Sequence, residues 1–491
     1  MKSSWLLIPA ILLTVACASR GLPEDFLEQE ADIFPDYKEV TIPPNVAPLN
    51  FSVAEEGLWR LVVEGTGASF DVRARHGLFR IPAGKWRRIL DTSRGDTLRL
   101  TVCRKEDGKW TALAPFRIFV ATDAIDSHLA YRLIAPGYGL WNEMGIYQRD
   151  LQSYRQTPLY ENRLTSYNCV NCHSFRMQDP GQMVFHMRAT YGGTVLCDRD
   201  HYEKLNTKTP ETLSALVYPY WHPQGDFIAF SVNRTLQSFH TRDANRIEVY
   251  DSASDVVVYD LRGHAVFSDS LLMRKDAFET FPTFSPDGKI LYFCCAPAVD
   301  PMPEGYKAVH YNLCRIGFDP DTRTFRGPVD TLFHAADSSS ASFPRISPDG
   351  RRLVFTKHAY GTFSIWHKDA DLYMLDLENG TASAMEAANS DDVESYHSWS
   401  HDSRWMVFSS RRLDGLYTRL YITHIDSLGT VSKPFLLPQK DPARYYADLM
   451  FSYNIPEFIT GPVRFSRHRI ASMMRQSPGT DLTFAGTGDR P

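Results

Sequence analysis

The sequence predicts an all-β protein, and two observations carry this prediction. Strand-length runs with alternating apolar and polar residues recur along most of the 491 residues, bounded by Gly, Pro and Asp turns. A pattern of strand, Pro-Asp-Gly turn and second strand returns several times in the second half of the chain. The composition, 43% hydrophobic and 23% charged, is that of an ordinary globular chain long enough for more than one domain.

Residues 1–17 have the features of a secretion signal. Lys2 is the positive residue, positions 5–15 form an apolar run too short to span a membrane, and a small residue precedes Cys17. The segment resembles a bacterial lipoprotein signal, which implies an acylated Cys17 and an extracytoplasmic protein tethered to a bacterial membrane, periplasmic or at the outer surface. Thr14 stands where that family usually has Leu, so secretion with a free Cys17 is the alternative.

Residues 18–39 are acidic and contain two prolines, which predicts a solvated spacer. From 40 to 125 the pattern changes to short strands, expected at 58–63, 68–72, 97–102 and 116–120. Several short strands at this spacing predict a small β-sandwich of immunoglobulin-like type. The region contains no visible catalytic cluster, and Cys103 is expected to be a buried thiol.

Repeats predict the architecture of residues 126–465. The segment 221–230 is echoed at 284–293, at 346–355 and, more loosely, at 399–408. The spacing is 63 residues from Gly225 to Gly288, 62 to Gly350 and 53 to the matching Ser403. Four strands per repeat at this spacing indicate the blade of a β-propeller. Two weaker echoes at 146–151 and 174–185 bring the expected number of blades to about six, and residues 466–491 are expected to be a C-terminal tail.

The Ser-Pro-Asp-Gly turns followed by alternating strands resemble the TolB-like, WD40-like propeller family known as PD40, over residues 216–437. This resemblance is specific for fold and much less so for function. Together with the lipoprotein signal and the motif described next, the chain resembles TolB-like propeller lipoproteins of Bacteroidetes type.

The chemistry-bearing motif is Cys169-Val170-Asn171-Cys172-His173. The spacing is that of a c-type haem, with two thioether attachments and His173 as the proximal iron ligand. Its place in the repeat corresponds to 218–221 of the next blade, which predicts a site near one mouth of the propeller channel. The local candidates for the sixth ligand are Met177, Met183, His186 and Met187.

Interpretations of the motif that need no haem stay open. Cys169 and Cys172 could form a disulfide in an oxidising compartment. A redox dithiol lacks its usual thioredoxin-like setting, and a zinc site lacks a second ligand pair, since Cys197 and His201 form only a loose Cys-x₃-His. The adjacent thiols Cys294 and Cys295 are expected on opposite faces of a strand, with Cys314 near either.

Other function classes find little support. A net charge of −5 gives no basic surplus for nucleic-acid binding. The Gly-x-Ser-x-Gly elbow of a hydrolase is absent from the sequence, and no transferase motif is found, so no enzyme is predicted. We therefore expect electron transfer or redox sensing by one covalent haem, coupled to protein binding on the propeller face. The alternative is a haem-free interaction scaffold in which a Cys169–Cys172 disulfide braces a loop.

Overall fold

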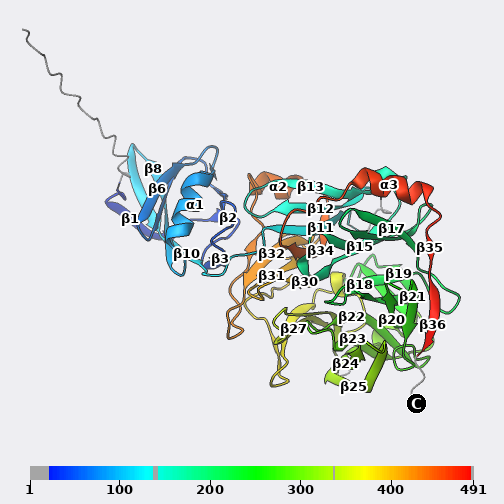
Figure 1. Cartoon of the computed structure of the whole chain (residues 1–491). Helices are drawn as coiled ribbons and strands as arrows, with labels where there is room; N and C mark the ends of the chain where they lie inside the picture. Colours follow the sequence, from blue (N-terminus) through cyan, green and yellow to red (C-terminus); the bar gives the residue numbers. More distant parts are fainter. Residues whose placement is uncertain (1–20, 137–141, 336–337, 488–491) are drawn as a thin grey trace, which may run out of the picture.

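The computed structural model describes residues 21–136, 142–335 and 338–487, which form two parts (Figure 1). A small N-terminal domain of two sheets and one helix stands beside a larger body of six sheets. Strands make up most of the regular structure of these residues, which confirms the all-β class. The expected signal, with Cys17, lies outside the described residues. None of the described helices reaches the length and hydropathy of a membrane span.

The N-terminal domain contains the four strands that the sequence predicts. The larger sheet has the order β1-β9-β8-β10-β3, with β5 paired to β8 and β6. Its strands are β1 (Asp25–Glu30), β3 (Val40–Ile42), β5 (Leu58–Gly65), β6 (Ala68–Arg73), β8 (Thr97–Glu106), β9 (Lys109–Ala114) and β10 (Phe116–Val120). The smaller sheet holds β2 (Ile33–Phe34), β4 (Phe51–Val53) and β7 (Leu78–Phe79). The immunoglobulin-like type of this domain stays a prediction.

Two features of this domain differ from the sequence expectation. The segment 18–39, expected as a spacer, contains β1 and β2; the acidic residues of β1 stay exposed because this edge strand pairs only with β9. Helix α1 (Ala83–Thr92) is also unexpected. Its buried side chains, Trp86, Ile89 and Leu90, have helical spacing, but one short helix among strand patterns gives a weak signal.

The larger body consists of sheets I to VI. Sheet I holds β34 (Ser452–Ile459), β11 (His128–Ile134), β12 (Met144–Asp150) and β13 (Gln156–Glu161), and sheet II holds β14 (Val170–Phe175), β15 (Gln182–Met187), β16 (Gly193–Asp198), β17 (His201–Asn206) and β35 (Thr480–Asp481). Sheet III holds β18 (Val217–Trp221), β19 (Phe227–Phe239), β20 (Ile247–Asp260), β21 (Ala265–Ser268) and β36 (Thr483–Thr487). Sheet IV holds β22 (Ala277–Phe284), β23 (Ile290–Pro297), β24 (Asn312–Asp319) and β25 (Thr324–Phe333). Sheet V holds β26 (Ser340–Ile346), β27 (Arg352–His358), β28 (Asp371–Asp376) and β29 (Ala382–Ala384), and sheet VI holds β30 (Glu394–Trp399), β31 (Trp405–Ser410), β32 (Arg419–His424) and β33 (Phe435–Leu436).

The inner strands of these sheets contact one another in a closed cycle. Each of β14, β18, β22, β26, β30 and β34 lies at one end of its sheet and contacts the inner strand of the sheet before and after it. The cycle closes through β34, which comes from the C-terminal part of the chain and pairs with β11. This strand begins at Ser452, within the part of the chain expected to form the propeller. Residues more than 300 positions apart therefore share sheet I.

The repeated turn has the structure that the sequence predicts. Gly225, Gly288 and Gly350 all have positive φ, between 73° and 84°, which glycine adopts without strain. The Ser of each Ser-Pro-Asp-Gly turn closes it with its hydroxyl: Ser347 Oγ donates to Asp349 Oδ1 at 2.6 Å and accepts from the Arg352 N–H at 3.0 Å. The turn and the start of the next strand are thus fixed by the same side chain.

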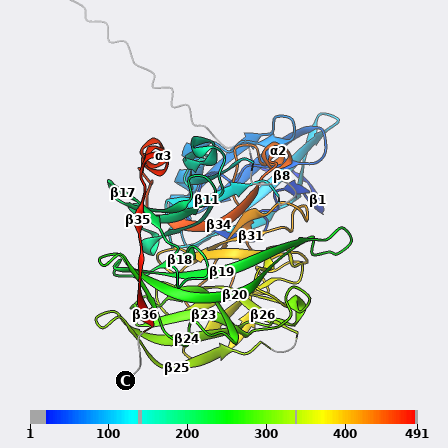
Figure 2. The same cartoon turned by 90° about the vertical axis from the view of Figure 1, so that its right-hand side faces the viewer.

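Residues 467–487 contain a helix and two strands where a tail is expected. After helix α2 (Pro442–Asp448) and β34, the chain forms helix α3 (Arg467–Gln476) and then β35 and β36. These two short strands add in parallel to the outer edges of sheets II and III, so that the end of the chain ties neighbouring sheets together (Figure 2). Their sequence contains little apolar alternation, which explains why the pattern predicts a tail.

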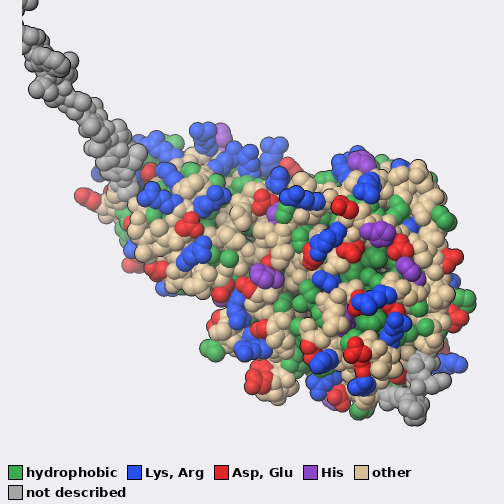
Figure 3. Space-filling view, viewed as in Figure 1, with side chains coloured by type: hydrophobic (Ala, Val, Ile, Leu, Met, Phe, Trp, Pro, Cys, Tyr) green, Lys and Arg blue, Asp and Glu red, His purple; other side chains and the backbone are tan. Residues whose placement is uncertain are grey.

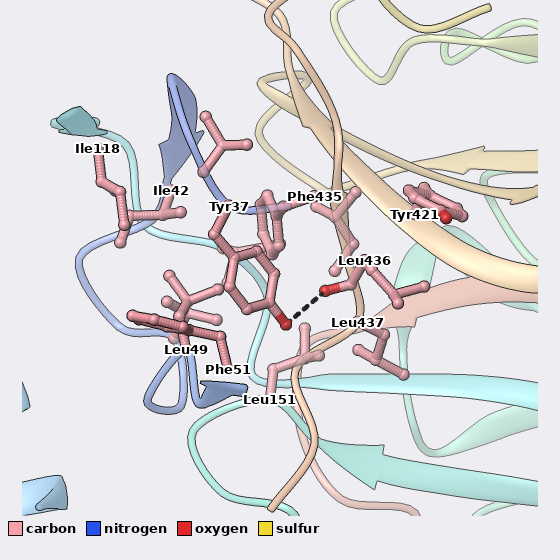
Figure 4. Packing of buried hydrophobic residues seen from close by; sticks show 14 of the residues in the cluster. Tyr37, Ile42, Leu49, Phe51, Ile118, Leu151, Tyr421, Phe435, Leu436 and Leu437 are labelled. Carbon is pink, nitrogen blue, oxygen red and sulfur yellow. Dashed lines mark hydrogen bonds between the residues drawn. The ribbon is translucent and has the colours of Figure 1, made fainter. Parts of the chain in front are cut away.

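One continuous apolar core joins the N-terminal domain to sheet VI. Tyr37 is fully buried, and its hydroxyl donates to the Leu436 carbonyl at 3.3 Å (Figure 4). Leu49 and Phe51 from the N-terminal domain belong to the same cluster as Phe435 from β33. Because this contact is buried and apolar, we expect the two parts to behave as one unit.

Candidate functional site

The Cys-x₂-Cys-His motif lies on the inner strand of sheet II. Cys169 precedes β14, and Cys172 and His173 lie within it. The exposed fractions of Cys169, Cys172 and His173 are 6, 3 and 2%. The innermost position agrees with the sequence expectation, and the motif is enclosed within the fold.

A bulge recurs at the same place in the inner strands. In β14 the register shifts between Asn171 and Ser174, and Cys172 has a φ of 51°. Tyr218, Phe281, Phe343 and Ile455 have φ values of 51° to 54° in β18, β22, β26 and β34. Cys172 thus takes the place that an aromatic or aliphatic side chain holds in four other sheets.

The side chains at these bulges pack against one another in the middle of the body. The ring centroids of Tyr218 and Phe281 lie 4.7 Å apart, those of Phe281 and Phe343 4.6 Å, and those of Phe343 and Tyr396 4.5 Å. These distances are typical of attractive aromatic pairs. An apolar plug therefore fills the centre of the ring of inner strands, with the Cys172 thiol beside it.

The electrostatics of the motif favour uncharged side chains. Burial raises the pKa of the Cys172 thiol, although the Tyr218 backbone N–H and the nearby Arg188 and Arg132 oppose this shift. Burial, with the Arg132 guanidinium adding to it, lowers the pKa of His173 to about 3. The imidazole is neutral at physiological pH, and neither of its nitrogens has a hydrogen-bond partner among the described residues.

The fit to a haem can be tested on these observations. The donor chemistry is suitable, because a neutral His173 with a free lone pair could ligate iron. The available space is too small for a haem. The side chains of Cys169, Cys172 and His173 are all enclosed, and the cavity that reaches β14 has a volume of about 50 Å³. Pockets for organic ligands measure roughly 300–1,000 Å³. As packed here, the motif does not accommodate a haem.

The four sixth-ligand candidates lie in three different surroundings. Met183 and Met187 on β15 share an apolar cluster with Cys169. His186 lies opposite Asn171, its pKa is lowered to about 3 by burial, and its Nδ1 is 3.1 Å from the Thr194 hydroxyl. Met177, in the short 3₁₀ turn Arg176–Gln178, is partly exposed. The fold does not bring the four to one point.

Beyond the motif, the six inner strands surround a funnel, the 50 Å³ cavity mentioned above. Every sheet contributes to its wall; one residue from each of sheets I to VI is Glu457, Phe175, Tyr220, Phe284, Arg345 and Trp399. Indole N–H groups link neighbouring sheets here: Trp221 donates to the Ser174 carbonyl and Trp399 to the Arg345 carbonyl, both at 3.1 Å. The funnel has room for a few water molecules or one side-chain tip.

Two ionisable residues, Glu457 and Arg345, give the funnel its chemistry. Glu457 Oε2 accepts from the Phe175 N–H at 3.0 Å, and burial raises the pKa of this carboxyl to about 8 despite the nearby Arg345. The Arg345 guanidinium lies 5.5 Å from the centre of the Tyr220 ring. The sequence analysis missed both residues, although a charge among the apolar residues just before a Ser-Pro-Asp-Gly turn, as at Arg345, is a signal that could be found.

The remaining cysteines behave largely as expected. Cys103 is a buried free thiol, and the described cysteines form no disulfide with one another. Cys294 and Cys295 lie in different apolar clusters, as expected for opposite faces, and Cys314 joins that of Cys295. The Arg274 guanidinium donates to Cys295 Sγ at 3.0 Å. In the described part of the chain, no group of three or more His, Cys, Asp or Glu side chains could hold a metal ion.

Comparisons with known proteins give distant structural likenesses. No family model and no curated protein matches the sequence. Among solved structures, hydrazine synthase of Kuenenia stuttgartiensis is 14% identical over 53% of this chain and 64% of its own, with a TM-score of 0.31. The tricorn protease is 12% identical over 78% and 36%, with a TM-score of 0.37. Prolyl oligopeptidase B of Galerina marginata is 9% identical over 62% and 44%, with a TM-score of 0.35. The chain spans less than two thirds of the length of each of these proteins.

Proposed function

We propose that the chain is an extracytoplasmic, lipid-anchored six-bladed β-propeller that binds a protein partner at its axial funnel and works without a haem. The observation that carries this proposal is the funnel, to which all six sheets contribute side chains. A site assembled from all repeats lies on the axis of a propeller, a common place for binding.

Two observations support the propeller. The inner strands contact one another in a closed cycle of six, and the last one is supplied by the C-terminal part of the chain. The bulge with positive φ recurs in five of the inner strands. A repeated unit that packs against two neighbours and closes on itself buries its sheet faces without leaving an end.

The chemistry of the funnel suits one inserted side chain of a partner. Arg345 offers a cation beside an aromatic wall, and the neutral carboxyl of Glu457 can donate as well as accept a hydrogen bond. The volume of about 50 Å³ admits the end of one side chain and excludes a bulky ligand. We therefore expect the rim to provide most of the contact area and the funnel to provide specificity.

Site-specific photocrosslinking in the native host tests this proposal. A crosslinker at Met177, on the funnel wall, is expected to capture one partner, whereas a crosslinker at the exposed Leu428, which does not line the funnel, should not. Arg345→Ala should abolish the captured band, and Lys275→Ala, an exposed cation outside the funnel, should leave it unchanged. Equal capture at both crosslinker positions, or capture that is insensitive to Arg345→Ala, would contradict axial binding.

A covalent haem in electron transfer or redox sensing is the second candidate function. The observation that favours it is His173, a buried neutral imidazole with no partner for either nitrogen among the described residues. Buried polar atoms of this kind are uncommon and call for an explanation. A haem would use Cys169, Cys172 and His173, and the strand would have to open to admit it.

Oxidised and reduced optical spectra, with haem staining of a denaturing gel, decide between the candidates. The haem-free proposal predicts a colourless protein from cells that contain the c-type maturation machinery. A Soret band that is lost in Cys169→Ala and Cys172→Ala would establish the haem instead.

A further inference from the structure

One face of the N-terminal domain is strongly basic. Between residues 73 and 94 the chain has seven exposed Lys and Arg side chains and one acidic residue, Asp91, although the whole chain carries a net charge of −5. We call these seven residues the basic face: Arg73 and Arg75 lie at the end of β6 and just after it, Arg80 follows β7, and Lys85, Arg87, Arg88 and Arg94 lie on α1 or just after it. Lys and Arg side chains gather along the upper side of this domain in Figure 3.

The fold makes little use of these cations. The ion pairs found for them in the described residues are Arg94 with Asp91 at 3.4 Å and Arg80 with Asp441 at 3.5 Å, and both pairs are exposed. Helix α1 is held by its opposite side, where Trp86 is buried and donates to the Val46 carbonyl at 3.2 Å. Lys85 even lies in the first turn, where the helix dipole favours an acidic residue. The charges therefore call for a role outside the fold.

The start of the chain brings the anchor of the proposed function close to this domain. Gly21, the first described residue, belongs to the N-terminal domain, where its carbonyl accepts a hydrogen bond from Arg60 Nη2 at 3.1 Å. Three residues lie between it and Cys17, so the two Cα atoms are at most about 14 Å apart. If Cys17 carries lipid, as the proposed function states, the start of this domain is held within about 14 Å of the acylated residue.

We propose that the basic face docks on the anionic phospholipid headgroups of the membrane that carries the anchor. The inference rests on the lipid anchor of the proposed function. Each Lys or Arg near an anionic bilayer contributes about fivefold to the binding constant, and the effect falls off within a Debye length. Docking would fix the orientation of the N-terminal domain, and through the buried Tyr37 contact that of the six sheets, relative to the membrane.

Vesicle co-sedimentation of the full chain carrying Cys17→Ser tests the basic face without the anchor. This protein is expected to bind vesicles that contain phosphatidylglycerol and not to bind vesicles of phosphatidylcholine alone. Added salt should release it from the anionic vesicles. The combined variant Lys85→Gln, Arg87→Gln and Arg88→Gln should bind roughly 100-fold more weakly. The matched control, Lys275→Gln, Lys289→Gln and Arg351→Gln, removes three exposed cations of the larger body and should bind as the parent does.

Several outcomes would overturn the docking surface. These are equal binding by the two triple variants, equal binding to neutral vesicles, or tighter binding to an oligonucleotide than to anionic vesicles. Thermal melting of both variants checks that each is folded. The anchor itself is tested separately, because membrane fractionation of the natural chain against Cys17→Ser reports on acylation whether or not the vesicles are bound.

Discussion

Glu457 and His173 both have surroundings that disfavour the charged form of their side chains. His173 is buried and Glu457 is half-buried, and removal from water drives each toward its neutral form: the pKa of Glu457 rises to about 8 and that of His173 falls to about 3. The sequence predicted that His173 matters, because its motif is local. It could not predict Glu457, because the neighbours that shift its pKa come from other sheets.

Glu457 should make stability depend on pH. A carboxyl whose pKa is raised on folding binds its proton more tightly in the folded state, so stability is lost as pH rises from about 4.5 toward 8. Glu457→Gln removes this loss. The free energy of unfolding of the variant minus that of the natural chain should therefore be about 1–3 kcal/mol larger at pH 9 than at pH 5. Denaturant titrations at the two pH values measure this, and a pH-independent difference would refute the assignment.

His173→Leu separates the two candidate functions by stability. In a haem-free protein the substitution removes a buried imidazole without hydrogen bonds, so the free energy of unfolding should rise by about 1 kcal/mol. In a haem protein it removes an iron ligand and should destabilise. Thermal melting of the two proteins from the native host gives the answer, and a large drop in Tm would contradict the haem-free account.

The sequence predicts elements that are determined by residues close together in the chain. It does not predict elements that form only through contacts with other sheets. The Ser-Pro-Asp-Gly hairpins carry a capping serine, proline and glycine within four consecutive residues, and they form where the sequence predicts them. Strands β35 and β36 form only because sheets II and III present free edges to them. Helix α1 depends on three side chains that pack into the N-terminal core.

The turn serines should each contribute measurably to stability. Ser347→Ala removes one bond donated to Asp349 and one accepted from Arg352, and should cost about 1–2 kcal/mol of unfolding free energy. Ser383→Ala, at an exposed position on β29, should stay within about 0.5 kcal/mol of the parent. Equilibrium unfolding in urea compares the two, and equal values would show that the hydroxyl does not hold the turn.

At the scale of the molecule, one buried apolar core joins the N-terminal domain to the larger body. The apolar core that contains Tyr37 continues from the N-terminal domain into sheet VI, and the C-terminal strand β34 completes sheet I. We expect a single calorimetric transition for the natural chain. Tyr37→Ala, which opens a cavity in this contact and should cost about 3–5 kcal/mol, should separate the transition into two. A single transition in the variant would mean that the contact does not couple the parts.

Peptide mass spectrometry of residues 169–173 from the native host tests most directly whether this protein works without a haem. We expect Cys169 and Cys172 to be recovered without a haem adduct. A peptide that carries a covalently bound haem would contradict it and make electron transfer the function to pursue.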